Sequence, residues 1–484
     1  MVDGVRGVCG RFVAALGFAV FFSVFAPATF AKTGGQAAVA NPTTAVEQAA
    51  GAQDGAPADG AASSAASVAA AGTSVATAVT INAPATVPPE MPADLWQQPY
   101  MFNWGPGRDR LASRGVSFNF AYAIDGLDDV QRPEGTRQDF GGWGRIRGTV
   151  VVDFSKFSRA KGLTYYATSV WQYGQNMGNV IGSIVDPSGL ASIHTFRLDS
   201  MWFEQSLFDG KLFLKVGQFA AQDYYGFQEY GNNFVIEALN YAFGNLGNVR
   251  ASWDPASGPA VEIRVVPTKY FYAKSGVFSP ENYSSTGFDY HKTDNHGLDS
   301  SATWDSEIGF HTDPDAPATR KSYSGIVKAG AVYNGGKFLD YKKNADVTGN
   351  YTIYVQVAQP VYRMEAGSNR GLDVTAGVNS GPAAKSEVPT EATFGATFNG
   401  PFRARPQDAA SFGLVCSKIG GDYNHRLALQ AEPEFSNENA VEFNYKAMIA
   451  PWLLIQPVFQ HYTDVGGRRG QPASLVGLRL EATF

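Results

Sequence analysis

Charged side chains occupy alternate positions in several short segments of this chain. Arg145, Arg147 and Asp153 share one parity, while Ile146, Gly148 and the residues that follow at the other parity are apolar or small. Alternate side chains of an extended strand point to one face, so this face would carry hydrogen-bond donors and acceptors of both signs. Such groups can replace the hydration shell of a polar, uncharged solute. The same pattern adds Arg197, Asp199, Glu262, Arg264, Glu442, Lys446, Arg479 and Glu481 as candidates.

These segments belong to a series of sixteen predicted strands. Each is about nine to thirteen residues long, the length that a tilted strand needs to cross a bilayer. The predicted strands are 115–124, 144–154, 161–173, 195–206, 211–219, 259–266, 270–278, 303–311, 323–334, 351–362, 371–380, 391–400, 409–418, 440–449, 452–462 and 475–484.

The connections between these strands alternate in length. Those after odd-numbered strands are mostly long, as at 220–258, whereas those after even-numbered strands are mostly tight, as at 208–210 and 450–451. Long loops on one side and short turns on the other are typical of an outer-membrane barrel with an even strand number. The predicted fold is therefore an all-β, transmembrane, antiparallel β-barrel of about 16 strands.

The last predicted strand carries its apolar residues at one parity and ends on Phe484. A carboxyl-terminal aromatic residue on such a strand resembles the end of a bacterial outer-membrane barrel, so Phe484 is the candidate assembly signal. In a closed barrel the last strand pairs with the first and leaves no free edge in lipid. We expect the partner segment to be Val116, Phe118, Phe120 and Tyr122.

The amino-terminal region predicts secretion. Residues 1–31 combine basic residues, a short apolar run and small residues, as a signal peptide does, and cleavage fits after Ala28 or after Ala31. Residues 32–93 are rich in Ala with scattered Gly and Pro, which predicts a low-complexity, disordered spacer of unassigned role. The barrel is then expected over 94–484, in the outer membrane of a Gram-negative bacterium.

Five stretches, in the right order, resemble the carbohydrate-selective porins of the OprB family. They are Met201–Leu212 with Val216–Gln218, Arg264–Thr268 with Tyr270–Phe278, His296–Leu298, Gly400–Asp408 and Pro451–Pro457. The resemblance implies a sixteen-stranded outer-membrane channel for the passive diffusion of monosaccharides such as glucose. It implies no cofactor and no catalysis. Its expected partners are sugars, outer-membrane lipid, lipopolysaccharide and the outer-membrane assembly machinery, and both a monomer and a homotrimer fit.

Each candidate residue has a second interpretation. The charged groups can brace the barrel wall through ion pairs. We weight bracing over solute contact about two to one, because most ion pairs in proteins have no role beyond structure. The long loop 220–258 either folds into the lumen and narrows it or packs at the rim, and we weight the two about evenly, because a loop of this length rarely lacks a functional role. Its candidate constriction aromatics are Tyr224, Tyr225, Phe227, Tyr230 and Trp253.

Other classes of function fit less well. A formal net charge of −6 and the lack of a basic cluster argue against nucleic-acid binding. The six histidines are scattered, so no metal site is predicted. A general or anion-preferring porin, an outer-membrane barrel enzyme and a purely structural or adhesin-like barrel remain as alternatives, although no Ser–His or Asp–His spacing indicates an enzyme.

Overall fold

The computed structural model describes residues 100–101, 106–136, 138–192, 194–241, 248–251, 257–279, 302–312, 324–365 and 368–484. The predicted signal peptide (1–31) and spacer (32–93) lie outside these residues. No helix within the described ranges is long and apolar enough to cross a membrane.

Sixteen antiparallel strands form one closed barrel, in which each strand pairs with its sequence neighbours and β1 pairs with β16. This confirms the predicted fold class. The strands are β1 (Val116–Gln131), β2 (Phe140–Asp153), β3 (Leu163–Gln175), β4 (Thr195–Leu207), β5 (Leu212–Phe219), β6 (Gly258–Thr268), β7 (Phe271–Phe278), β8 (Thr303–His311), β9 (Ile326–Asp340), β10 (Ala345–Arg363), β11 (Gly371–Ser380), β12 (Thr390–Asn399), β13 (Ala409–Lys418), β14 (Glu438–Ala450), β15 (Leu453–Thr463) and β16 (Ala473–Thr483).

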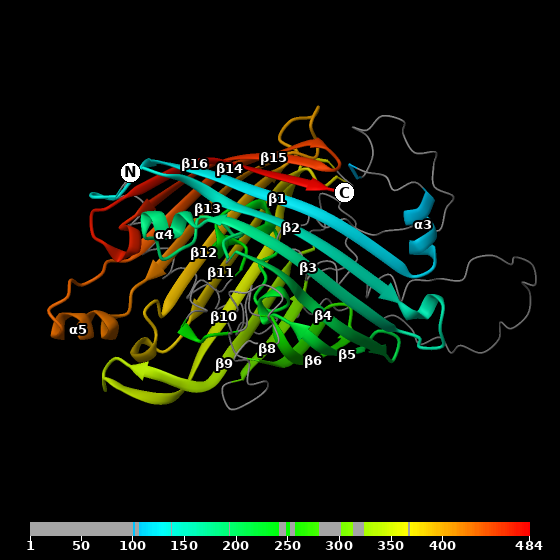
Figure 1. Ribbon diagram of the computed structural model, residues 1–484, viewed down its shortest axis with the longest axis horizontal. Helices are drawn as coiled ribbons and strands as arrows, with labels where there is room; N and C mark the ends of the chain where they lie inside the picture. The colour runs from blue at the N-terminus through cyan, green and yellow to red at the C-terminus, as the bar shows by residue number, and fades with distance from the viewer. Residues whose placement is uncertain are drawn as a thin grey trace, which may run out of the picture.

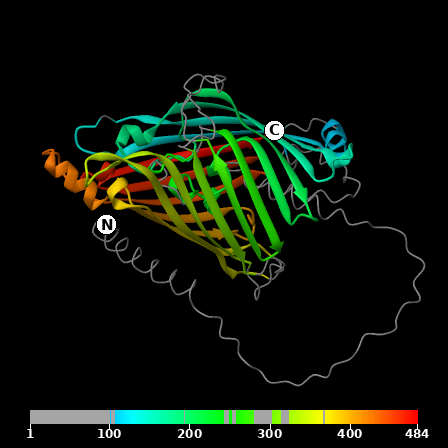
Figure 2. The same cartoon turned by 90° about the horizontal axis from the view of Figure 1, so that it is seen from below.

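The two ends of the barrel differ. The turn end carries α3 (Pro106–Ser113), the carboxyl terminus and tight connections such as 208–211 (Figure 1). The loop end carries α4 (Met177–Ile181), α5 (Gly421–Leu429) and the long connections. The strands tilt strongly between these ends (Figure 2). The short 3₁₀ helices are η2 (Phe154–Lys156), η3 (Ala221–Asp223), η4 (Gly231–Asn233), η5 (Glu237–Leu239), η8 (Ala383–Lys385) and η9 (Val465–Gly467).

The closing pair of strands has a different register from the predicted one. Strand β16 pairs with β1 from Ala121, opposite Thr483, to Gln131, opposite Ser474. Of the four residues expected to face β16, only Tyr122 falls within this register. The prediction chose the right strand and the wrong part of it, because barrel strands are tilted and staggered. Before Ala121, β1 pairs with β2, and the carbonyl oxygen of Phe120 also accepts from Phe484 N, just past the end of β16.

Two pairs of strands extend beyond their predicted limits. The β1–β2 ladder continues to Asp128 opposite Phe140, and the β9–β10 ladder to Asp340 opposite Ala345. Charged residues occupy both parities here, as at Asp128 and Asp129. The alternation between faces therefore disappears although backbone pairing continues, because these parts of the strands extend past the apolar band that imposes alternation.

The outer and inner faces of the wall differ in polarity. On β14, Phe443 is 52% exposed while its neighbour Glu442 has no exposed surface. On β16, Leu478 is 45% exposed and Arg479 only 2%. Apolar side chains thus cover the outside of the wall and charged side chains lie on its inside, the arrangement that lipid and water on opposite faces require.

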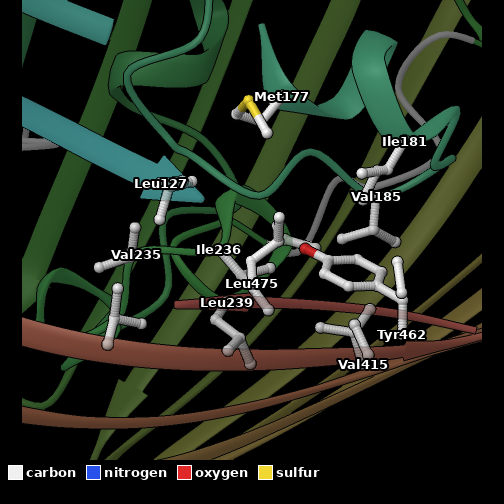
Figure 3. Close-up of a cluster of buried hydrophobic side chains, with 14 of the residues drawn as sticks. Leu127, Met177, Ile181, Val185, Val235, Ile236, Leu239, Val415, Tyr462 and Leu475 are labelled. Atoms are coloured by element: carbon white, nitrogen blue, oxygen red, sulfur yellow. The ribbon is translucent and has the colours of Figure 1, made fainter. Parts of the chain in front are cut away.

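Two connections at the loop end fold into the barrel. We call them loop A (residues 176–192) and loop B (residues 220–241). Their apolar side chains pack with inward side chains of β1 and of β13 to β16, as Figure 3 shows for Ile181, Ile236 and Leu239 against Val415 and Tyr462. At this end the loops therefore cover inward apolar side chains of the wall and lie inside the space that the strands enclose.

Candidate functional site

Loop B is fixed on one side to β14 and β16. The carboxylate of Glu442 accepts hydrogen bonds from the backbone N–H groups of Val235, at 2.8 Å, and Ile236, at 2.7 Å. Arg479 Nη1 donates to the carbonyl oxygen of Phe234 at 3.3 Å. Glu442 was predicted to line the pore, but loop B covers it completely. Its contacts make it an anchor for loop B, since a buried backbone amide needs an acceptor.

On the other side, loop B is fixed to β8, β10 and β11. Glu307 Oε2 accepts from the backbone N–H of Gly226 at 2.9 Å, and Gln356 Nε2 donates to the carbonyl oxygen of Gly226 at 2.6 Å. Gln228 Nε2 donates to Thr375 Oγ1 at 2.7 Å. Loop B thus crosses the inside of the barrel from β8–β11 to β14–β16 and narrows it. Of the two positions considered for this loop, the structure has the one inside the lumen.

Four predicted lumen residues gather on β2 and β4. Arg197 Nε lies 3.2 Å from Asp199 Oδ1, and Arg147 Nη2 lies 3.6 Å from Asp199 Oδ2. Arg197 Nη1 also donates to Gln172 Oε1 at 2.7 Å. The positive charge of Arg145 acts on the same carboxylate. Three arginines therefore surround the Asp199 carboxylate, and Arg145 also acts on Glu481 of β16.

Three more predicted residues lie on β14 and β16. Arg479 binds Asp125 of β1 through two hydrogen bonds of 2.6 and 2.7 Å, and both side chains are almost fully buried. Glu481 is partly exposed and lies within electrostatic reach of Lys446. Lys446 Nζ donates to the carbonyl oxygen of Asn232 at 3.4 Å. Arg479 therefore braces the closing strand pair, while Lys446 and Glu481 lie beside the tip of loop B.

A second group of predicted residues lies on β6. Glu262 Oε1 is 3.2 Å from Lys215 Nζ, and Arg264 Nη2 is 3.3 Å from Glu204 Oε1. Lys215 and Glu204 complete this group and are absent from the predicted set. Alternation marks Lys215, because Leu214, next to it, is 42% exposed on the outer face. Alternation does not mark Glu204, because a register shift at Asp199 reverses the parity of β4, whose inward residues are even-numbered from Ser200 onwards.

Asp153 lies apart from both groups. Its Oδ1 accepts from the backbone N–H of Ser155 at 2.9 Å and caps η2 at the turn end. This contact stabilises the β2–β3 connection, as an N-terminal cap does. The predicted charged residues therefore form one group on β2, β4, β14 and β16 and another on β6.

The predicted constriction aromatics divide into buried and accessible rings. Tyr224 and Tyr225 are only 6% and 0% exposed, because they pack on the inner wall, and burial raises the pKa of both phenols well above its ordinary value. Neither ring face is open to a solute, which corrects the prediction for these two. Phe227 forms an isolated bridge with Tyr241 and is partly buried. Tyr230 is partly exposed. Trp253 lies outside the described residues.

The inward position of loop A was not predicted. Its backbone N–H groups at Ile184 and Val185 donate to the Glu438 carboxylate at 2.9 and 2.8 Å. This repeats the way in which Glu442 holds loop B. The available signal was the five large apolar residues between Met177 and Val185, which are unusual for a connection expected to face water.

Asp186 links the two loops, and its protonation predicts a pH dependence. Its carbonyl oxygen accepts from Glu237 N at 3.1 Å, and its Oδ2 accepts from Asn176 Nδ2 at 2.7 Å. Burial raises the pKa of the Asp186 carboxyl to about 6, with a further increase from the charge of Asp125 and an opposing effect of the Asn176 hydrogen bond. The ordinary pKa is about 3.9, so the folded loop binds the proton more tightly than the unfolded loop.

We therefore expect loop A to become more stable as the pH falls from 7 through 6 towards 4. Hydrogen exchange of its amides, corrected for the intrinsic pH effect, should be slower at pH 5 than at pH 7. Asp186→Asn should reduce this difference. Faster corrected exchange at pH 5 in the wild type would contradict the assignment.

Comparison with known proteins agrees with this architecture. Residues 137–484 match the family model described as carbohydrate-selective porin, OprB family. Porin B of Pseudomonas aeruginosa is 25% identical over 430 residues, covering 79% of this chain and 90% of that protein. Putative porin QuiX of Acinetobacter baylyi is 20% identical over 434 residues, covering 81% of this chain and 95% of that protein.

Solved structures share the fold. The high-pH structure of Pseudomonas putida OprB superposes with a TM-score of 0.73 at 19% identity, covering 80% of this chain and 99% of that one. The low-pH structure of the same protein gives 0.52 at 17% identity. The family model spans all sixteen strands apart from β1, and it confirms the resemblance carried by the five sequence stretches. The chain belongs to the OprB family of carbohydrate-selective porins.

Proposed function

We propose that this protein is an outer-membrane channel of a Gram-negative bacterium for passive diffusion of glucose-type monosaccharides. The observation that carries this proposal is the inner wall, where arginine and lysine alternate with aspartate and glutamate beside a loop that narrows the lumen. The side chains of Arg147 and Arg264 are 11% and 17% exposed, and they pair with the buried carboxylates of Asp199 and Glu204. Membership of a carbohydrate-selective porin family supports the same conclusion.

The mechanism follows from the chemistry of the wall. A sugar hydroxyl both donates and accepts hydrogen bonds, so neighbouring guanidinium and carboxylate groups can replace its hydration in turn. Each such bond to a charged group contributes about 1.5–3 kcal/mol net, which is small enough to permit both entry and release. No energy source is required, and the direction of flux follows the sugar gradient. The proposal includes no cofactor and no covalent step.

Liposome swelling with a panel of mono- and disaccharides tests the function directly. We expect monosaccharides to enter faster than disaccharides and than charged solutes of equal size. Absence of both sugar uptake and conductance in planar bilayers would exclude a channel. The three arginines gathered on β2 and β4 support an anion-preferring porin as the second candidate. A strongly anion-selective reversal potential without sugar preference would favour it.

The Arg145→Ala, Arg147→Ala double variant should change transport while the barrel still assembles. Asp199 keeps Arg197 as a partner, so the wall is not left with an unpaired carboxylate. We expect about a tenfold weaker sugar interaction, since hydrogen bonds to charged groups are worth about 1.5 kcal/mol or more. Current noise in the presence of glucose measures it. Arg159→Ala, at an exposed position of the β2–β3 connection, is the matched control. Unchanged flux and ion selectivity would refute the role of the pair.

The proposed surroundings are outer-membrane lipid, lipopolysaccharide and, during biogenesis, the outer-membrane assembly machinery. Chemical cross-linking in native membranes distinguishes the monomer from the homotrimer, because a trimer gives a ladder of three bands.

A further inference from the structure

Tyr230 is held in a backbone conformation that its residue type disfavours. Its φ is 65° and its ψ is 1°, in the left-handed region. Glycine adopts this conformation without steric cost, whereas a Cβ atom makes it strained. Gly231 follows directly, so a glycine at 230 would have been the simpler solution for the chain. A strained residue that persists inside a lumen indicates that its side chain is needed there.

The surrounding contacts hold this backbone in place. Gly231 N donates to the carbonyl oxygen of Gln228 at 2.9 Å, and Asn233 N donates to that of Tyr230 at 3.2 Å. Gln228 and Asn233 are in turn bonded to β11 and β12 through Thr375, at 2.7 Å, and Thr397, at 3.4 Å. Tyr230 therefore lies at the tip of loop B, inside the barrel and fixed on both sides.

Hydrogen-bonding groups border the ring. Glu229 has a side chain that is 41% exposed and lies 3.3 Å from Lys328 Nζ. Asp373 on β11 accepts from Arg363 Nη1, and both charges act on the Tyr230 phenol together with that of Glu229. Tyr230 thus combines a partly exposed ring with neighbouring carboxylates. Tyr224 and Tyr225 lack this combination because the wall covers them.

We propose that Tyr230 is the sugar-stacking residue of the constriction. The apolar C–H face of a pyranose lies on the ring, while the exposed carboxylate of Glu229 accepts hydrogen bonds from its hydroxyl groups. Aromatic faces beside a few polar groups are the usual composition of small-molecule sites. This inference rests on the proposed sugar-channel function and specifies a residue that selects for sugars over other neutral solutes.

Substitutions at position 230 separate the role of the ring from that of the backbone. Tyr230→Gly removes the ring and relieves the positive φ, so the barrel should melt no lower than the wild type. Its half-saturation concentration for glucose should rise three- to tenfold, measured by sugar-induced current noise in planar bilayers. Tyr230→Phe retains the ring face and should stay within twofold of the wild type.

A matched control has the same backbone feature outside the lumen. Phe208 lies in the β4–β5 turn with a φ of 52°, and Phe208→Gly should leave glucose binding unchanged. Wild-type sugar binding in Tyr230→Gly would overturn the inference, and so would a loss in Tyr230→Phe equal to that in Tyr230→Gly. If the wild type itself takes up no sugar into liposomes, the proposed function fails, which is a separate result.

Discussion

Glu442→Ala is expected to loosen loop B inside an intact barrel. The carboxylate receives the backbone N–H groups of Val235 and Ile236 and, at 2.6 Å, the side-chain amide of Asn444. Hydrogen bonds to a charged group contribute about 1.5–3 kcal/mol each, and a buried donor that loses its acceptor adds a penalty. Even with partial compensation, about 3 kcal/mol corresponds to a hundredfold or larger rise in the local opening of the loop.

Two measurements should report this opening. Hydrogen exchange at Val235 and Ile236 should accelerate about a hundredfold, and single-channel recordings should gain brief steps of higher conductance. The strand ladder is untouched, so heat-modifiable migration on gels should remain. The apolar packing of Phe234 and Leu239 still favours the docked loop, which makes the openings transient.

The appropriate control is Glu432→Ala, an exposed glutamate on the connection that carries α5. It changes the net charge equally and touches neither loop A nor loop B in the described contacts. Glu442→Gln should have an intermediate effect, because the amide keeps one oxygen acceptor in place of two. Unchanged amide exchange in Glu442→Ala would show that apolar packing alone fixes loop B.

The strands were predictable because each of them separates lipid from water. That difference imposes alternation on residues such as Phe443 and Glu442, and a period of two is visible without any knowledge of partners. Where a strand no longer lies between lipid and water, as at Asp128 and Lys337, the predicted strand ends too early, although backbone pairing continues. The alternation pattern also does not determine the exact register of β1 on β16, because that register depends on the stagger of the whole barrel.

The inner site was only partly predictable, because the face of the sheet on which a side chain lies does not determine what covers that side chain. Alternation placed Glu442, Arg147 and Arg264 on the inner face, but it does not distinguish an open inner wall from one covered by a loop. That distinction depends on contacts between residues far apart in the sequence, such as Ile184 with Glu438. Whether an inward charged residue braces the wall or contacts solute therefore depends on where loops A and B lie.

The second large expected effect concerns two neighbouring groups, the Phe484 ring and the Arg108 guanidinium. The ring should affect insertion of the barrel, and the guanidinium should affect its thermal stability. Phe484 N donates to the carbonyl oxygen of Phe120 at 2.8 Å, and the carbonyl oxygen of Phe484 accepts from Arg108 Nη2 of α3 at 2.8 Å. Arg108 also donates to Phe118 at 3.2 Å and lies 3.7 Å from the centre of the Tyr100 ring. The backbone of the terminal residue is thus clamped to α3 and β1.

We expect Phe484→Ala to lower the yield of inserted barrel by about tenfold, because the terminal aromatic side chain is the proposed assembly signal. Quantitative membrane fractionation measures this yield. Barrels that do insert should conduct and melt as the wild type, since the backbone contacts to Phe120 and Arg108 do not require the ring.

Arg108→Ala should produce the opposite combination. The ring of Phe484 remains, so insertion should be normal, but the chain terminus loses a charge-assisted hydrogen bond worth about 1.5–3 kcal/mol. The inserted barrel should therefore lose its heat-modifiable gel migration at a lower temperature, with Arg108→Lys in between. Arg110→Ala, exposed on the same helix, should change neither quantity. If Arg108→Ala lowered insertion and left melting unchanged, the contact with the terminus would act during assembly, and the separation of ring from clamp would be wrong.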